Sequence, residues 1–221
     1  MYTIIRKKDL CTSVWSGGTT TQLAIYPPQS IYAQRNFKWR VSSAQVDDET
    51  STFTSLPNIA RILMPLEGDL ELSHKSKGDF HLAPFDQNHF WGDWHTTSRG
   101  KVKDFNVMLS EGSSKVDVLH LESTESYLNN TNLEELQYNT FFPTFWDKPL
   151  DKEEDCMSEL YYFYEGTSFE VVVANKKETL LAGDVLVYTA HKDEWGKYKL
   201  GIIAQAPQPS VIIKVQILHS R

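Results

Sequence analysis

Two arginines, Arg40 and Arg61, lie within segments that otherwise have the composition of buried β-strands. Arg40 belongs to residues 37–46, in which successive side chains alternate between two faces, and Arg61 lies at the start of the apolar run 60–66. Burying an arginine is unfavourable unless its charge is paired or hydrogen-bonded. Its planar guanidinium can also bind a carboxylate through two parallel hydrogen bonds. We therefore expect each arginine either to be neutralised by an acid of the protein or to hold a carboxylate ligand.

Other polar side chains share the faces of these strands. Ser42 is predicted on the same face as Arg40, and Asp104 and Asn106 share one face of the segment 104–109. On a structural hypothesis, Asp104 or Glu67 neutralises an arginine and the group only braces the fold. On a functional hypothesis, the group lines a polar pocket for a small carboxylate. The residues alone favour the two equally.

The histidines do not have the spacing of a common metal-binding strand motif. That motif places two His one residue apart, so that both point to one side of a strand, and the seven histidines of this chain include no such pair. His89 and His95 flank an aromatic segment and are the two that could approach each other. No GxSxG motif is present, and neither Cys11 nor Cys156 has a neighbouring His. We expect no metal, no cofactor and no catalytic nucleophile.

The glycine pair Gly17-Gly18 has two interpretations. Three threonines follow it, so its backbone N–H groups could receive an anion. It lacks the lysine and the length of a P-loop, and the simpler interpretation is a glycine turn.

Short β-strands separated by turns dominate the chain. Further strands are predicted near residues 70–72, 116–121, 159–164, 169–174, 179–181, 185–188 and 211–218. The turn signal Leu66-Glu67-Gly68 recurs about one hundred residues later as Tyr164-Glu165-Gly166, and residues 82–86 recur as 181–184, which indicates an internal duplication. The expected fold is all-β, a double-stranded β-helix or jelly roll in two halves, residues 1–112 and 113–221.

A long connection is expected at about residues 123–158. It contains a predicted short helix near 132–137 and an aromatic segment at 141–146. A connection of this length is unusual inside a compact domain, so it is predicted either to pack across the two halves or to act as a lid. The aromatic segment could also anchor a protein partner, although packing is its simpler role.

Composition narrows the class of protein. The formal net charge of the 221 residues is −7, and no long basic run is present, which argues against a nucleic-acid partner or an anionic membrane surface. No stretch approaches the ~20 apolar residues of a membrane span. The two cysteines lie far apart and the N-terminus has no apolar signal core, so we expect a cytoplasmic protein.

Several segments together resemble the HutD/Ves family. They are Trp15–Leu23, Tyr26-Pro27, Trp39–Ala44, Phe53–Pro57 with Arg61, Phe90–Asp93 and Asp104–Met108. Their order and spacing match over about residues 10–110, and Arg-x-Ser-x-Ala and Asp-Phe-Asn-x-Met are the more specific motifs. The C-terminal half is similar only in its strand rhythm. The resemblance implies a bacterial cytoplasmic bicupin, which is two cupin jelly rolls in one chain, without the usual metal motif.

The resemblance also implies a ligand site and a role. HutD proteins are associated with histidine utilisation, through binding of an intermediate such as formylglutamate, and Ves proteins with stress and cold response. The residues that match the family and would line or support the pocket are Trp15, Thr20, Gln22, Arg40, Ser42, Arg61, Asp104 and Asn106. The chain departs from the family at Gln22, where an acid is common, and in its shorter segment after Trp15. The loss of a negative charge at Gln22 changes which ligand would fit.

The sequence therefore predicts a bicupin that binds a small carboxylate and has a regulatory or accessory role. The alternative is a metal-independent cupin enzyme acting on a small polar metabolite, with Asp104, Glu67 or Asp93 as a general base if burial raises its pKa. Pairing of exposed jelly-roll edges would give a homodimer.

Overall fold

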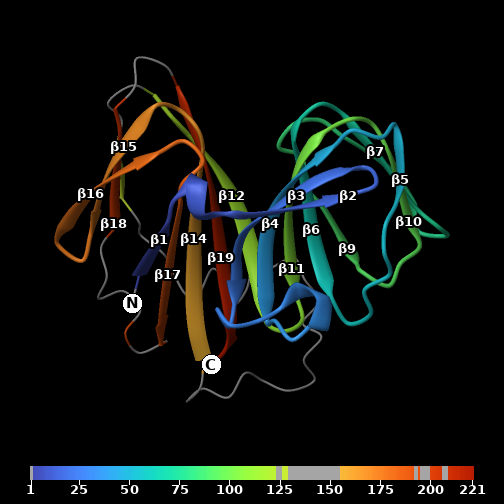
Figure 1. Cartoon of the computed structure of the whole chain (residues 1–221), viewed down its shortest axis with the longest axis horizontal. Helices are drawn as coiled ribbons and strands as arrows, with labels where there is room; N and C mark the ends of the chain where they lie inside the picture. Colours follow the sequence, from blue (N-terminus) through green and yellow to red (C-terminus); the bar gives the residue numbers. More distant parts are fainter. Residues whose placement is uncertain (1, 123–125, 129–154, 192–193, 195–199, 206–208) are drawn as a thin grey trace. The chain divides into compact units, whose positions relative to one another are not determined.

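The computed structural model describes residues 2–122, 126–128, 155–191, 194, 200–205 and 209–221 of the 221-residue chain. It divides into an N-terminal unit, residues 10–111, and a C-terminal unit formed by residues 1–9 and 112–221 (Figure 1). Within these described ranges all regular structure is β-strand, apart from the 3₁₀ turns η1 (Lys7–Asp9) and η2 (Tyr32–Gln34). The fold is the predicted one, two cupin jelly rolls in one chain.

The N-terminal unit is a sandwich of two antiparallel sheets. The larger sheet has the order β2-β3-β4-β11-β6-β9 and the smaller one β5-β10-β7-β8. Their strands are β2 (Cys11–Trp15), β3 (Gly18–Tyr26), β4 (Trp39–Val46), β5 (Thr50–Thr52), β6 (Ala60–Glu67), β7 (Leu70–His74), β8 (Gly78–Leu82), β9 (Asn88–Trp91), β10 (Thr96–Arg99) and β11 (Lys103–Leu109). Strand β11 therefore lies between β4 and β6, the two strands that carry the arginines.

The C-terminal unit repeats this arrangement. Its sheets have the orders β1-β17-β14-β19-β12 and β13-β18-β15-β16. Their strands are β1 (Tyr2–Ile5), β12 (Ser113–Leu121), β13 (Ser126–Leu128), β14 (Asp155–Glu165), β15 (Ser168–Val173), β16 (Lys176–Leu181), β17 (Val185–His191), β18 (Leu200–Ala204) and β19 (Ser210–Ser220). In the larger sheets, β4-β11-β6-β9 of the first unit corresponds to β12-β19-β14-β17 of the second.

The turn signals that suggested duplication occupy equivalent positions. The Asp86 carboxylate accepts a hydrogen bond from the Ala83 N–H at 3.0 Å, and the Asp184 carboxylate accepts one from the Leu181 N–H at the same distance. An aspartate that closes its own turn in this way stabilises a tight connection between strands. The second turn thus repeats the hydrogen bond of the first as well as its amino-acid pattern.

The first nine residues correct the expected division of the chain. They were assigned to the N-terminal half, but β1 pairs antiparallel with β17 in the C-terminal unit. Beside this strand, Arg6 forms an ion pair with Asp184 at 2.8 Å, and the Lys7 N–H donates to the same carboxylate at 2.9 Å. A four-residue edge strand has too short a pattern to reveal its partner, so only the tertiary structure shows where it pairs.

The long connection is shorter than predicted. Strand β14 already begins at Asp155, and β13 lies within the expected span. The predicted helix at 132–137 and the aromatic segment at 141–146 lie outside the described residues. No helix in the described ranges is long and apolar enough to cross a membrane.

Each unit has buried apolar clusters among its described residues. The C-terminal unit contains a cluster of twelve buried residues, among them Tyr161, Phe163 and Phe169. The described N-terminal clusters are smaller and include one around Leu72 and Phe90 and one around Leu56 and Ile59. Arg40 and Arg61 are buried as well, so the interior of the N-terminal unit is not wholly apolar.

Candidate ligand-binding site

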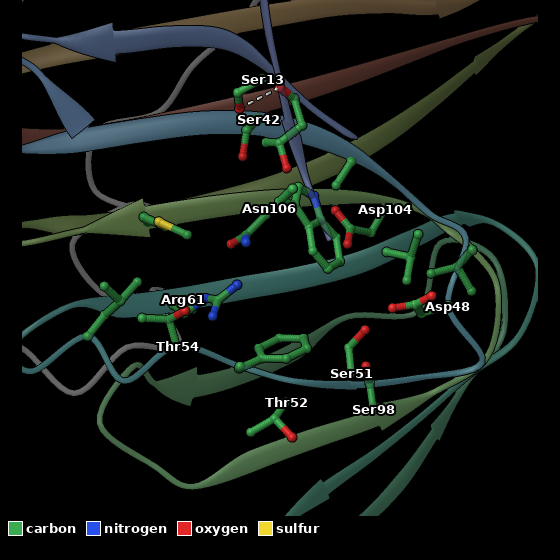
Figure 2. A pocket seen from close by; sticks show the side chains of 18 of the residues that line it. Ser13, Ser42, Asp48, Ser51, Thr52, Thr54, Arg61, Ser98, Asp104 and Asn106 are labelled. Atoms are coloured by element: carbon green, nitrogen blue, oxygen red, sulfur yellow. Dashed lines mark hydrogen bonds between the residues drawn. The ribbon is translucent and has the colours of Figure 1, made fainter. Parts of the chain in front are cut away.

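A cavity of about 660 Å³ opens within the N-terminal unit. It is lined from β2 to β7, from β10 and β11, and from the turn η2. Figure 2 shows Arg61, Asn106 and Asp104 projecting into it from β6 and β11, with Ser51 and Ser98 across from them. A volume of several hundred Å³ with convergent polar groups is typical of a small-molecule site.

The structure brings together all of the sequence-predicted site residues. Seven of the eight line the cavity: Trp15, Thr20, Arg40, Ser42, Arg61, Asp104 and Asn106. The eighth, Gln22, lies behind Arg40 and is hydrogen-bonded to it. Whether these residues bind a ligand stays a prediction.

Sheet register explains why these residues meet. Met108 of β11 lies opposite Arg40 of β4 and opposite Arg61 of β6, so both arginines are at one level of the sheet. The next inward-facing level contains Ser42 and Asn106, which are also opposite each other. Two strand spacings separate the backbones of Arg40 and Arg61 by about 10 Å. Both long side chains can therefore reach a small molecule between them.

Arg40 is held by neutral groups. Its Nε donates to Gln22 Oε1 at 3.0 Å and its Nη1 to Ser42 Oγ at 3.2 Å. The guanidinium stacks on the Tyr32 ring, with the Arg40 Cζ 4.1 Å from the ring centroid. Burial lowers the Arg40 pKa, because the interior disfavours the charged form. No acid within the described ranges forms an ion pair with Arg40.

Arg61 is as deeply buried as Arg40 and has fewer hydrogen-bond partners. The side chain is 6% exposed and packs against two aromatic rings, with its Cζ 4.8 Å from the Phe53 centroid and 5.1 Å from the Phe90 centroid. Its Nε is buried without a hydrogen-bond acceptor. Burial lowers the Arg61 pKa to about 10, although the charge of Asp104 acts in the opposite direction. The rings hold the guanidinium in place beside the cavity that Arg61 lines.

Asp104 and Asn106 also carry unsatisfied atoms. The Oδ1 atoms of both side chains are buried without a donor, and the residues are 8% and 7% exposed. Burial raises the Asp104 pKa from 3.8 to about 7, and the nearby charge of Arg61 only partly opposes this effect. Native proteins rarely leave several buried polar groups unpaired at one place, so this concentration makes the cavity the candidate site of the N-terminal unit.

An Asp104→Asn variant should report this raised pKa through stability. The unfolded carboxyl ionises near pH 4, whereas the folded one keeps its proton until about pH 7. Folding therefore becomes less favourable as the pH rises through that window. We expect the wild type to lose about 2–3 kcal/mol of stability relative to Asp104→Asn between pH 5 and pH 8. Urea unfolding at the two pH values measures the difference, and parallel pH profiles would show that Asp104 ionises normally.

The hairpin of β2 and β3 forms part of the cavity wall. Trp15 lies opposite Gly18 in this hairpin and lines the cavity. A Cβ at Gly17 would overlap the Trp15 indole, so only glycine lets the ring lie over the backbone there. Gly17 lies in the hairpin turn and Gly18 begins β3, in agreement with the simpler interpretation of Gly17-Gly18 as a glycine turn.

Two predicted acids do not belong to the site. Glu67, considered as a partner for an arginine or as a general base, is exposed and pairs with Lys103 at 3.3 Å. The end of β6 turns Glu67 away from the interior, which corrects that expectation. Asp93 is exposed and does not line the cavity. In the described part of the chain, no group of three or more His, Cys, Asp or Glu residues is arranged to hold a metal ion. His89 and His95 therefore belong to no such group.

Sequence reasoning missed the aromatic and hydroxyl walls. Tyr32, Phe53 and Ser51 were not predicted, yet all three line the cavity and two of them stack on its arginines. Phe53 stood next to the predicted residues within a family motif, which was an available signal. Tyr32 comes from a 3₁₀ turn between strands, and no local pattern places it there.

The C-terminal unit has different side chains at the equivalent positions. By strand register, Glu159 takes the place of Arg61, Gln216 that of Met108 and Lys214 that of Asn106. Glu159 accepts hydrogen bonds from Tyr161 and Gln216, both at 2.8 Å. Lys214 lies 3.4 Å from Glu159 and 3.0 Å from the Tyr127 hydroxyl. The second set satisfies itself, whereas the first leaves an arginine, an acid and an amide with free atoms.

Solved structures support the fold over the whole chain. A conserved protein of unknown function, PA5104 from Pseudomonas aeruginosa PAO1, covers 100% of both chains with a TM-score of 0.67 and 18% identity. HutD from Pseudomonas fluorescens SBW25, in a formate condition, covers 100% of both chains with a TM-score of 0.61 and 16% identity. The nickel(II) complex of the bacterial pirin YhhW from Escherichia coli gives a TM-score of 0.64 at 7% identity, again over 100% of both chains.

Comparison of the amino-acid sequence with known families identifies one family. No curated protein matches the chain. The family model described as HutD matches residues 7–142, which is more than half of the chain and includes every residue of the cavity. The resemblance expected from the motifs is thereby confirmed, and the chain belongs to the HutD family.

Proposed function

We propose that the N-terminal unit binds a small organic carboxylate and that the protein acts through this binding, in a regulatory or accessory role. The observation that carries the proposal is Arg61, a buried guanidinium in a cavity with a free Nε and no ion pair to a described residue. A bound carboxylate would supply both the missing acceptor and the missing counter-charge.

The charge of the cavity supports an anionic ligand. Two arginines line it, and the buried acid Asp104 has a pKa of about 7, so it is about half protonated at neutral pH. Asp48 also lines the cavity but is exposed to solvent. The site is thus locally positive in a protein whose net charge is −7, and such a local field favours anions.

The hydroxyl groups around the arginines support a small, polar ligand. The hydroxyl-bearing residues of the lining, tyrosine apart, are Ser13, Ser16, Thr20, Ser42, Thr50, Ser51, Thr52, Thr54 and Ser98. Hydroxyls both donate and accept hydrogen bonds, so they accommodate varied polar groups. HutD-family membership places the acidic intermediates of histidine utilisation among the carboxylates to be tested.

A Gln22→Glu variant tests whether the charge of Arg40 is used. Gln22 accepts a hydrogen bond from Arg40 Nε and leaves the charge of Arg40 uncompensated. A glutamate at position 22 would neutralise the charge of Arg40. We expect Gln22→Glu to bind carboxylates about tenfold more weakly, or about 1.4 kcal/mol. Gln22→Met is the matched control, because it removes the hydrogen bond without adding charge.

The measurement is calorimetric titration with succinate, glutarate and formylglutamate, each beside its neutral amide. The proposal requires that the wild type prefer the carboxylates and that Gln22→Glu lose more affinity than Gln22→Met. If the amides bind equally well, or if no carboxylate binds, the cavity does not select anions.

One observation favours a second candidate, a metal-independent enzyme. A carboxyl group with a pKa near 7 can act as a general acid or base at neutral pH, and Asp104 is such a group inside the cavity. Proton NMR of the titration samples over several hours distinguishes the two functions. Conversion of a bound carboxylate, lost in Asp104→Asn, would support the enzyme.

A further inference from the structure

Four buried side-chain atoms of the cavity lining have no hydrogen-bond partner. Arg61 Nε can only donate, Asn106 Oδ1 and the ionised Asp104 Oδ1 can only accept, and the Ser51 hydroxyl can do either. A simple carboxylate satisfies only the donors, because its oxygens accept hydrogen bonds and cannot donate them. A carboxylate ligand alone would leave Asn106 Oδ1 unpaired, and above pH 7, where Asp104 is ionised, it would leave Asp104 Oδ1 unpaired as well.

We propose that the ligand is a free α-amino acid, with its carboxylate on Arg61 and its ammonium group on Asp104 Oδ1 and Asn106 Oδ1. This inference rests on the proposed function, because it concerns the same cavity and assumes that Arg61 binds the carboxylate. It adds the chemical class of the ligand.

The strands place the two halves of this site close together. Asp104 and Asn106 lie two residues apart on one face of β11, and Arg61 lies on the adjacent strand β6. Figure 2 shows the three side chains on one side of the cavity. An ammonium group has three donors, enough to reach both oxygens, and it lies one carbon from the carboxylate in an α-amino acid.

Electrostatics distinguish an ammonium group from other donors. Asp104 holds its proton up to about pH 7 because burial opposes its charge, and the free site provides too little positive charge nearby. A ligand ammonium would supply that charge, so Asp104 would ionise on binding and form a charge-assisted hydrogen bond. A hydroxyl donor would give the weaker neutral interaction.

In the C-terminal unit the protein itself supplies the partners of a buried acid. There the carboxylate of Glu159 receives its donors from Tyr161 and Gln216, and its positive partner is Lys214. In the N-terminal unit no described side chain supplies a donor to Asp104 Oδ1. The ammonium group of the ligand would take the role that Lys214 has in the other unit.

The experiment compares ligands that differ only in the amino group. Calorimetric titrations at pH 7.5 pair glutamate with glutarate, aspartate with succinate, and alanine with propanoate, and 2-hydroxyglutarate tests a hydroxyl in place of the ammonium. We expect at least one amino acid to bind ten times or more tightly than its deaminated partner and, for the glutamate pair, than the hydroxy acid. Asp104→Asn should reduce this preference to less than threefold, whereas Asp93→Asn, an exposed acid outside the cavity, should keep it.

The outcomes separate this inference from the proposed function. Carboxylates that bind equally well with or without the amino group overturn the amino-acid inference and leave carboxylate binding intact. The same holds if 2-hydroxyglutarate equals glutamate, or if Asp104→Asn keeps the full preference. Absence of binding by every member of the panel overturns both.

Discussion

Replacing Arg61 with methionine is expected to abolish carboxylate binding and to leave the fold at least as stable as before. Methionine keeps much of the length and the apolar surface that pack between Phe53 and Phe90. It removes a buried charge that has no ion pair to a described residue and a buried Nε that has no acceptor. Replacement of a buried charge by a well-packed apolar side chain is often neutral or stabilising by about 1–4 kcal/mol.

The binding loss should be large. A charged hydrogen bond contributes about 1.5–3 kcal/mol, and Arg61 would make two or more of them to one carboxylate. We expect the affinity of the tightest carboxylate to fall at least a hundredfold. Calorimetric titration measures the affinity and urea unfolding measures the stability of the same samples.

This pair of measurements decides between the two hypotheses that the sequence left open. If Arg61 only braced the fold, Arg61→Met would destabilise it by several kcal/mol and binding would be unrelated. Arg99→Met serves as the control, because Arg99 is exposed at the end of β10 and does not line the cavity. A variant that is destabilised and still binds would refute the functional role of Arg61.

Replacing Lys214 with methionine should have the opposite effect on stability. Lys214 and Glu159 are buried, with side chains 6% and 1% exposed, and they form an ion pair at 3.4 Å. Removal of one partner of a buried pair leaves the other charge without its counter-ion. Such changes destabilise proteins by about 3–5 kcal/mol, so we expect a loss of about 3 kcal/mol in urea unfolding.

A double variant tests the reason for that loss. Glu159→Gln in the Lys214→Met background removes the stranded charge and keeps groups that can bond to Tyr161 and Gln216. We expect it to recover more than half of the lost stability. If Lys214→Met alone unfolds at the wild-type urea concentration, the pair does not contribute to the stability of the C-terminal unit.

Local alternation made the strands and their faces predictable. In β4, Arg40 and Ser42 were expected on one face, and both line the cavity, as do Ala44 and Val46, which follow at the same two-residue spacing. Side chains two residues apart in a strand must point to the same side, whatever the strand pairs with. For the same reason the shared face of Asp104 and Asn106 could be predicted, as could the duplication of short, turn-bounded strands.

Which strand faces meet around the cavity could be seen only in the tertiary structure. Arg40 and Arg61 come to one level only because β11 pairs with both β4 and β6 in a particular register. The sequence contains no local signal for that pairing, nor for the stacking of Tyr32 on Arg40 or the pairing of β1 with β17. It also could not show that Glu67 turns outward to Lys103 and leaves Arg61 without an acid at ion-pair distance.

The amino-acid sequence by itself thus determined an all-β bicupin, the HutD resemblance and the side chains that face inward. The tertiary structure alone decided which of those side chains meet and which keep free polar atoms. The physical reason is that the backbone geometry of a single strand decides which way each side chain points. Whether a buried polar atom finds a hydrogen-bond partner depends instead on every neighbour that packing brings near it. Arg61, Asp104 and Asn106 could be predicted as inward-facing residues, but only the folded chain shows that each keeps a buried polar atom without a hydrogen-bond partner.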